Sequence, residues 1–316
     1  MTAATPRVSV VMSAYNSADF LALALDSILA QTFTDFECLV HDDGSTDGTW
    51  NILQEYAARD PRIIPTTGPN QGIVPCINQL IASARGAFIA RMDADDICLP
   101  ERFAKQVAFM DARPDHVLLG ANWLAIDGGG RAIFPSDLPL DHDEIDQLNI
   151  RGLTSLLQPV AMVRTQALRD LGGYDPEFRR SQDLDMWLRL AEVGQIANLP
   201  DILLRYRIHD QSVSTATQGL QGQLARLACE NAWARRGVTG SYDHIPYRPD
   251  GSRASRRAYY IRYGWDGWRW GFRDTWRHYA VKAVQTDPLS ADAWKLLVFG
   301  AIRRPPPGKY VLPGNV

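Results

Sequence analysis

The chain has 316 residues, with 33 Lys and Arg against 36 Asp and Glu, and 46% of its residues are hydrophobic. Such a chain is long enough to bury a sizeable core, and its net charge of −3 disfavours nucleic acid as the main partner. The amino terminus lacks the pattern of a signal peptide, and no run of 18 apolar residues occurs. Four cysteines are widely spaced, which favours reduced thiols in a cytoplasmic protein: Cys38, Cys76, Cys98 and Cys229.

Two apolar, β-branched runs near the amino terminus predict buried strands that each end in a polar loop. Residues 8–12 lead into Ala14, Tyr15 and Asn16, and residues 36–41 lead into Asp42 and Asp43. A helical pattern follows each loop, at residues 21–29 and 50–59. This alternation predicts an α/β fold with a parallel sheet, in which ligands bind beyond the carboxyl ends of the strands.

The acidic residues of the second loop have two interpretations. Asp42, Asp43 and Asp47 can cap the helix that follows, because Asp is a preferred residue at helix starts. They can also belong to a ligand site at the strand end. We assign Asp43 to the site and leave both interpretations open for Asp47.

A second acidic loop follows the apolar residues 87–90. Asp93, Asp95 and Asp96 place three carboxylates within four positions, and Pro100 then opens a helix. Such crowding needs a counter-charge, and a divalent cation such as Mg²⁺ or Mn²⁺ supplies it and can also hold phosphates. A solvated acidic loop is the alternative. Two acidic loops at strand ends favour one nucleotide site.

These segments resemble glycosyltransferase family 2, which has a mixed, Rossmann-like GT-A sheet flanked by helices. The resemblance covers about 210 residues and rests on four ordered motifs: residues 8–16, Asp42-Asp43-Gly44-Ser45, Asn70-Gln71-Gly72 and Met92-Asp93-Ala94-Asp95-Asp96. It implies that Asp43 binds the base of a nucleotide sugar and that Asp95, with Asp93, binds the metal. The donor-binding residues we predict are Ala14, Tyr15, Asn16, Asp42, Asp43, Asn70, Gly72, Arg91, Asp93 and Ala94.

The middle of the chain carries a further motif of the family. A Gly-Gly-Tyr-Asp turn at residues 172–175 precedes an amphipathic helix that contains Gln182 and Asp183. The resemblance implies that Asp183 is the general base, although the family has Glu where this chain has Gln182. Asp185 is the local rival, but it lies about 200° further round the helix. A helix-start charge is the alternative for Asp183.

A strand-like segment at residues 203–209 ends in His209, which the resemblance suggests as a further metal ligand, with a purely structural role as the alternative. We therefore expect a catalytic domain at 1–215 and a helical extension at 216–316. Arginines and aromatic residues interleave in that extension. Helical spacing of Trp265, Trp268, Phe272 and Trp276 favours core packing against the catalytic domain over contact with nucleic acid or an anionic membrane.

The sequence thus predicts an inverting glycosyltransferase that uses a divalent metal and a nucleoside-diphosphate sugar. Because the Asp43 carboxylate can accept from an N–H at a base edge, UDP is favoured, dTDP or GDP are allowed, and cytidine donors are disfavoured. The acceptor would be a glycan or a lipid-linked hydroxyl, with peripheral contact at the inner face of the membrane as an option. The alternatives are a sugar-nucleotide nucleotidyltransferase and a non-catalytic scaffold that binds sugar nucleotides.

Overall fold

The computed structural model describes residues 5–209, 218–243 and 252–303. The chain divides into two compact units. The first comprises residues 1–123, 137–206 and 216–246, and the second comprises residues 124–136, 207–215 and 247–316. The predicted border at 215/216 lies outside the described residues. The helix that follows it, α8 (Gln218–Arg236), groups with the first unit.

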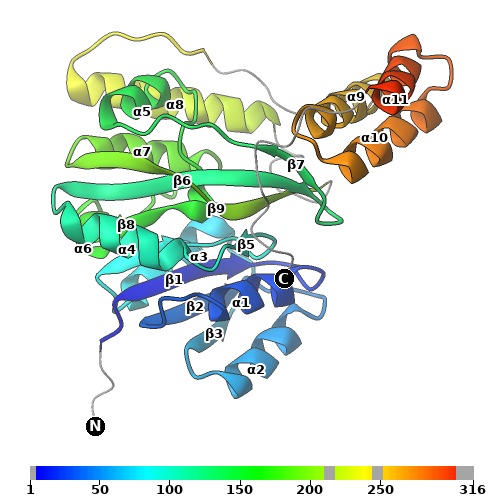
Figure 1. The fold of residues 1–316 in the computed structure, drawn as a ribbon. Coiled ribbons are helices and arrows are strands. Elements are labelled where there is room, and N and C mark those ends of the chain that lie inside the picture. Colours follow the sequence, from blue (N-terminus) through cyan, green and yellow to red (C-terminus); the bar gives the residue numbers. More distant parts are fainter. Residues whose placement is uncertain (1–4, 210–217, 244–251, 304–316) are drawn as a thin grey trace. The chain divides into compact units, whose positions relative to one another are not determined.

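Four parallel strands begin the sheet of the first unit: β1 (Val8–Ala14), β2 (Phe36–Asp42), β3 (Ile63–Thr67) and β4 (Phe88–Arg91). Helices α1 (Leu21–Leu29), α2 (Thr49–Arg59) and α3 (Ile73–Ser83) connect them (Figure 1). The strands pair in the order β3-β2-β1-β4. Parallel pairing directs all their carboxyl ends to one edge, as the strand and helix alternation predicts.

The sheet continues as β8-β6-β9-β5, and β8 runs antiparallel to β4. The bounds of these strands are β5 (Ile97–Cys98), β6 (His116–Asp127), β8 (Met162–Arg164) and β9 (Gln195–Ile208). The remaining helices of the unit are α4 (Arg102–Ala112), α5 (His142–Asn149), a 3₁₀ turn η1 (Gln158–Val160), α6 (Thr165–Asp170) and α7 (Gln182–Ala191). This mixed sheet flanked by helices confirms the predicted fold class.

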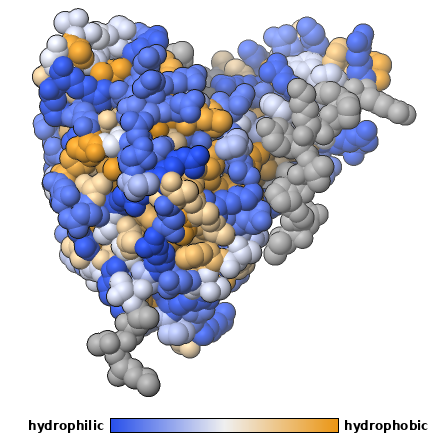
Figure 2. All heavy atoms as spheres, turned by 60° about the vertical axis from the view of Figure 1, so that its left-hand side comes forward, coloured by the Kyte–Doolittle hydropathy of each residue, from blue (hydrophilic) through white to orange (hydrophobic). Residues whose placement is uncertain are grey.

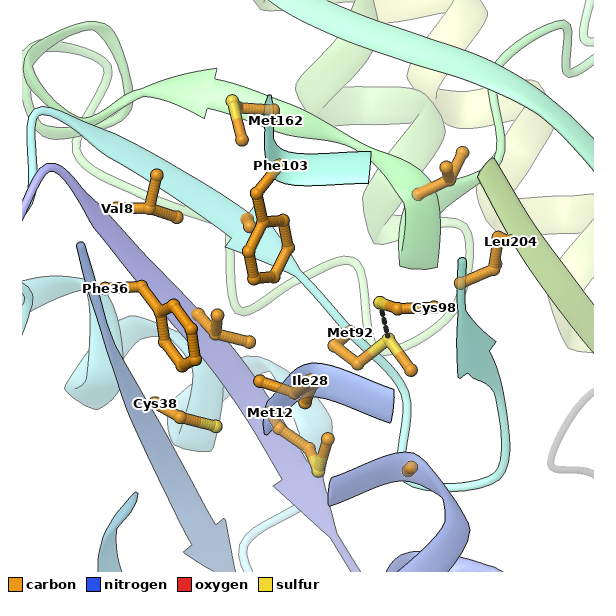
Figure 3. Packing of buried hydrophobic residues seen from close by; sticks show 14 of the residues in the cluster. Val8, Met12, Ile28, Phe36, Cys38, Met92, Cys98, Phe103, Met162 and Leu204 are labelled. Atoms are coloured by element: carbon orange, nitrogen blue, oxygen red, sulfur yellow. Dashed lines mark hydrogen bonds between the residues drawn. The ribbon is translucent and has the colours of Figure 1, made fainter. Parts of the chain in front are cut away.

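Two hydrophobic clusters fill the two faces of the sheet, because strand residues alternate between them. One cluster joins Val10 and Cys38 of the strands to Ile28 of α1 and Phe103 of α4. Figure 3 shows its packing, including the Cys98 thiol, which donates to the Met92 sulfur at 3.3 Å. The other cluster joins Val11 and Leu39 to α3, α6 and α7. Hydrophobic packing on both faces of the sheet therefore fixes the position of the strands.

The second unit contains β7 (Ala132–Pro135), which pairs with residues 124–126 of β6, and three helices, α9 (Arg253–Arg269), α10 (Arg273–Thr286) and α11 (Ala291–Ile302). Residues 128–131 join β6 to β7.

The aromatic residues of the second unit pack inside it. Trp276 is 8% exposed, and Trp265 and Trp268 lie edge-on to Phe299 with 5.4 Å between ring centroids. Arg269 and Arg277 lie on the exposed side of their helices. Within this unit Trp276 is buried and Trp265, Trp268 and Phe272 are partly buried, and the expected packing against the catalytic domain stays a prediction.

Hydrophilic residues cover most of the face drawn in Figure 2, with smaller hydrophobic areas between them. Among the helices that the structure describes, none is both long and apolar enough to span a bilayer.

Candidate active site

The predicted donor-binding residues follow the ends of neighbouring parallel strands. Ala14 at the end of β1 lies opposite Asp42 at the end of β2, and Val11 of β1 lies opposite Arg91, the last residue of β4. The two loops that carry aspartates therefore leave the sheet on either side of β1. This arrangement brings together the motifs that are separated by fifty residues in the sequence.

Asp42 and Asp43 are both buried, at 2% and 3% exposure, and they have different partners. Asp42 accepts from Thr67 Oγ1 at 3.0 Å and from Ser45 N, so it ties β2 to β3 and closes its own loop. Asp43 accepts from the backbone N–H groups of Gln71 and Gly72 at 2.7 and 2.9 Å. The Asp43 carboxylate thus fixes the loop that contains Asn70 and Gly72 next to the strand end.

Gly44 is required at this point. Its φ is +74°, and a Cβ there would lie 2.9 Å from the backbone nitrogen of Asn70. Asn70 itself is exposed. Only glycine allows residues 44 and 70 to approach so closely in a left-handed conformation.

Two hydrogen bonds join the first loop to the second loop. Asn16 has φ +47°, its N–H donates to Ser45 Oγ at 2.9 Å, and its Oδ1 accepts from Thr46 N at 2.8 Å. Tyr15 is 52% exposed, so its ring is open to a ligand. Asp47 accepts from the N–H groups of Ala18 and Thr49, at 3.1 and 3.0 Å. Of the two interpretations of Asp47, these bonds favour the structural one at the start of α2.

The loop after β4 holds the crowded carboxylates. Asp93 is partly exposed, at 32%, and accepts from Arg91 at 2.8 Å. Burial raises the pKa of Asp93, and the charges of Asp95 and Asp183 raise it further, while Arg91 opposes the shift. Asp96, the third aspartate of the loop, is fully buried.

Two buried arginines form hydrogen bonds with backbone carbonyl oxygens next to this loop. The Arg91 guanidinium, 1% exposed, donates to the carbonyl oxygens of Val11 and Met92 as well as to Asp93. Arg102, at the start of α4, is fully buried and donates to the carbonyl oxygen of Arg91 at 2.7 Å and to Cys98 Sγ. Our sequence reasoning missed Arg102, because arginine at the start of a helix is usually solvated. Arg91 contacts the site through Asp93.

Asp183 lies in the first turn of α7, ninety residues from the acidic loop. One of its carboxylate oxygens accepts from Leu184 N at 2.9 Å, and burial raises its pKa. Since its charge acts on Asp93, the carboxylates of Asp93, Asp95 and Asp183 belong to one electrostatic cluster.

Asp185 points elsewhere, as the helical spacing predicts. It is 2% exposed and pairs with Arg189, one turn along α7, at 2.7 Å. Arg189 also donates to the carbonyl oxygens of Leu171 and Gly173, both at 3.0 Å. This pair fastens the Gly-Gly turn to α7, so the Asp185 carboxylate is already engaged by Arg189.

Gln182 has a neutral partner. Its Nε2 donates to Gln158 Oε1 at 3.3 Å, and Gln158 Nε2 donates to the hydroxyl oxygen of Tyr174, also at 3.3 Å. Ser181, which begins α7 with φ +55°, donates to the carbonyl oxygen of Gln221 in α8. A Gln at 182 can donate to Gln158, whereas an ionised Glu cannot. The chain of two amides and a phenol was not predicted from the sequence.

His209 follows β9 in the second unit, and its role as a metal ligand stays a prediction. A cavity of ≈ 480 Å³ is lined by residues including Phe109, His116, Asp141 and Asn198. It contains none of the residues that we assign to the site.

Comparison with known proteins supports the motif-based assignment. The family model "Glycosyl transferase family 2" matches residues 9–172, just over half of the chain. The chain is 31% identical over 210 residues to the amylovoran biosynthesis glycosyltransferase AmsE of Erwinia amylovora. The alignment covers 65% of this chain and 78% of that protein.

Solved structures show the same fold at lower identity. TarS residues 1–349 of S. aureus, in complex with UDP-GlcNAc, has a TM-score of 0.58 at 18% identity, covering 89% of this chain and 81% of that one. The mannosyltransferase PcManGT of Pyrobaculum calidifontis, in complex with GDP-Man and Mn²⁺, has a TM-score of 0.56 at 19% identity, with 95% and 81% covered. The motifs, the fold and these matches agree, and the chain belongs to glycosyltransferase family 2.

Proposed function

We propose that this glycosyltransferase inverts the anomeric centre when it moves a sugar from a nucleoside diphosphate to an acceptor hydroxyl, with Asp183 as general base. What supports the proposal is the place of Asp183 in the first turn of α7, near enough to the acidic loop for its charge to raise the pKa of Asp93. A base and a set of metal-binding carboxylates are what a single displacement needs on the two sides of the anomeric carbon.

In this mechanism the acceptor oxygen attacks the anomeric carbon while its proton passes to the Asp183 carboxylate. The bond from that carbon to the diphosphate oxygen breaks, and the diphosphate leaves with the electron pair. Burial raises the pKa of Asp183, so its carboxylate is a stronger base than a solvated aspartate. No covalent intermediate with the protein forms.

The nucleoside end of the donor would bind at the ends of β1 and β2. The ring of Tyr15 is exposed there, and Asp43 accepts an N–H from the base edge beside its bonds to Gln71 and Gly72. Uracil, thymine and guanine offer such an N–H. We favour UDP among these bases, and the nucleotides bound to the two structural neighbours, UDP-GlcNAc and GDP-Man, fit this requirement.

The diphosphate would lie at the acidic loop. A divalent cation fits there, because carboxylate oxygens suit Mg²⁺ and Mn²⁺ and because the charges of Asp95 and Asp183 both act on Asp93. Asp95 and Asp93 are the proposed ligands, with His209 as a further candidate. When bound, the cation would neutralise the charge of the departing diphosphate.

A screen of sugar nucleotides with manganese, read by thermal unfolding of the whole chain, tests the proposal. A nucleotide present at 100 times its Kd stabilises the folded state by about 2.7 kcal/mol. We expect stabilisation by one or more uridine, thymidine or guanosine donors and none by cytidine donors. Stabilisation by cytidine donors alone would contradict the role of Asp43, and no stabilisation by any donor would contradict the site.

A further inference from the structure

Three buried side chains of the first unit bring a nitrogen, an oxygen and a sulfur atom together. His41 lies on β2, Asp43 follows that strand, and Cys76 lies on α3. One ligand atom of each lies within 4.8 Å of the other two, and the three residues are 1%, 3% and 0% exposed. Residues 41 and 43 face the same side of the sheet because side chains alternate along a strand, and α3 covers that side.

The His41 ring is held on one side and open on the other. Its Nδ1 forms a hydrogen bond with Thr66 Oγ1 at 2.9 Å. Its Nε2 is buried and has no hydrogen-bond partner among the described residues. A buried nitrogen without a partner costs about 1–3 kcal/mol. Histidines that bind metals have this arrangement, with one ring nitrogen anchored by a neighbour and the other directed at the ion.

Cys76 completes a mixed set of donor atoms. Burial and a hydrogen bond to Asp43 raise the pKa of its thiol to about 12, so without a metal it keeps its proton. A thiolate, an imidazole and a carboxylate suit zinc, whereas the oxygen ligands Asp93 and Asp95 suit magnesium or manganese. Zinc bonds of about 2.0–2.3 Å place tetrahedral ligands about 3.3–3.8 Å apart, so a closure of about 1 Å completes the site.

We propose that His41, Asp43 and Cys76 form a second metal site, specific for zinc, and that zinc bound there weakens binding of the donor nucleotide. On binding, the Cys76 proton leaves to solvent and its sulfur bonds to the ion. The inhibition rests on the proposed function, because it needs Asp43 to bind the base. An Asp43 oxygen that coordinates zinc no longer accepts freely from a base N–H. The zinc site itself stands without that role.

Zinc binding is measured by titrating the metal-free whole chain with zinc chloride in competition with a chromophoric chelator. We expect one zinc ion per chain with a Kd of about 1 µM or below. His41→Gln and Cys76→Ser should each weaken it by about 100-fold or more. Cys38→Ser is the matched control, because Cys38 is a fully buried cysteine on β2 outside the cluster, and it should bind zinc as the wild type does.

A second measurement needs no variant. Cobalt added to the metal-free wild type should give a sulfur-to-cobalt charge-transfer absorption, which reports a thiolate ligand directly. Absence of that absorption, or unchanged zinc affinity in both His41→Gln and Cys76→Ser, would overturn the site.

The effect of zinc on donor binding is tested separately, by measuring UDP affinity. Zinc at saturation should weaken UDP binding by about 10-fold or more in the wild type and leave it unchanged in Cys76→Ser. Zinc binding with no UDP binding under any condition would refute the proposed function and keep the metal site. Equal UDP affinity with and without zinc would refute the inhibition alone.

Discussion

Asp183 and Asp185 lie two positions apart on α7, and the same substitution should affect them in opposite ways. Burial raises the pKa of Asp183 above its unfolded value of about 3.9, so the charged form costs stability once the pH exceeds that value. Asp183→Asn removes the charge and should stabilise the chain by about 1 kcal/mol at pH 7. The gain should vanish as the pH falls toward 4, where the wild-type carboxyl is protonated.

Asp185→Asn should destabilise. Asp185 is paired with Arg189, whose side chain is 14% exposed and also holds two backbone carbonyl oxygens. Burial raises the pKa of Asp185, and the charge of Arg189 opposes that rise. The substitution leaves the Arg189 charge buried without its charged partner, which should cost about 3 kcal/mol. This value is the low end for a broken buried pair, because the Asn side chain keeps a hydrogen-bond acceptor.

The two variants also separate catalysis from folding. Asp183→Asn should keep nucleotide binding and lower turnover by about 100-fold or more, since it removes the proton acceptor. Asp185→Asn should keep turnover at temperatures where it is folded. Denaturant unfolding and product release, measured on both variants side by side, check these outcomes. Near-normal transfer by Asp183→Asn together with loss of transfer in Asp185→Asn would refute the assignment of the base.

Three other predictions concern pH, the glycine turn and the second unit. Because the pKa of Asp183 is raised, the transfer rate at saturating substrates should fall as the pH drops toward that pKa. A pH profile from about pH 8 down to about pH 4 checks this, and a rate that stays flat over the whole profile would contradict Asp183 as the base. Gly44→Ala should cost more than the control Gly130→Ala in thermal unfolding, since both have positive φ but only Gly44 also meets backbone within 3 Å. Flotation with anionic vesicles should show no binding that depends on Arg269, Arg273 and Arg277, and such dependence would contradict a purely internal role of the aromatic stripe.

The strand ends and their acidic loops could be predicted because they depend on local patterns. Apolar runs that stop at Asp42 and at Asp93 indicate buried strands followed by loops, and helical spacing separates Asp183 from Asp185. The buried arginine Arg102, which bonds the backbone next to the acidic loop, could not be predicted. Nothing in the local sequence shows that Arg102 turns inward, because two of its partners, the Arg91 carbonyl oxygen and Cys98 Sγ, lie in other elements.

Local sequence patterns also could not predict how the chain divides into two units. It depends on the pairing of β7 with the end of β6 and on the contacts of α8 with α7. Both are long-range contacts, which composition and periodicity do not report. The proposed zinc site is also of this kind, since His41 and Cys76 are brought together only when α3 packs on β2.

Calorimetric titration of UDP is the most direct test of a donor site built on the acidic loop. The wild type should bind UDP with Mn²⁺ present about 100-fold more tightly than with a chelator, because the Asp93 and Asp95 carboxylates otherwise repel the diphosphate. Asp95→Asn with Mn²⁺ should bind as weakly as the chelated wild type. Equal UDP affinity in all three titrations would contradict a cation-dependent donor site at this loop.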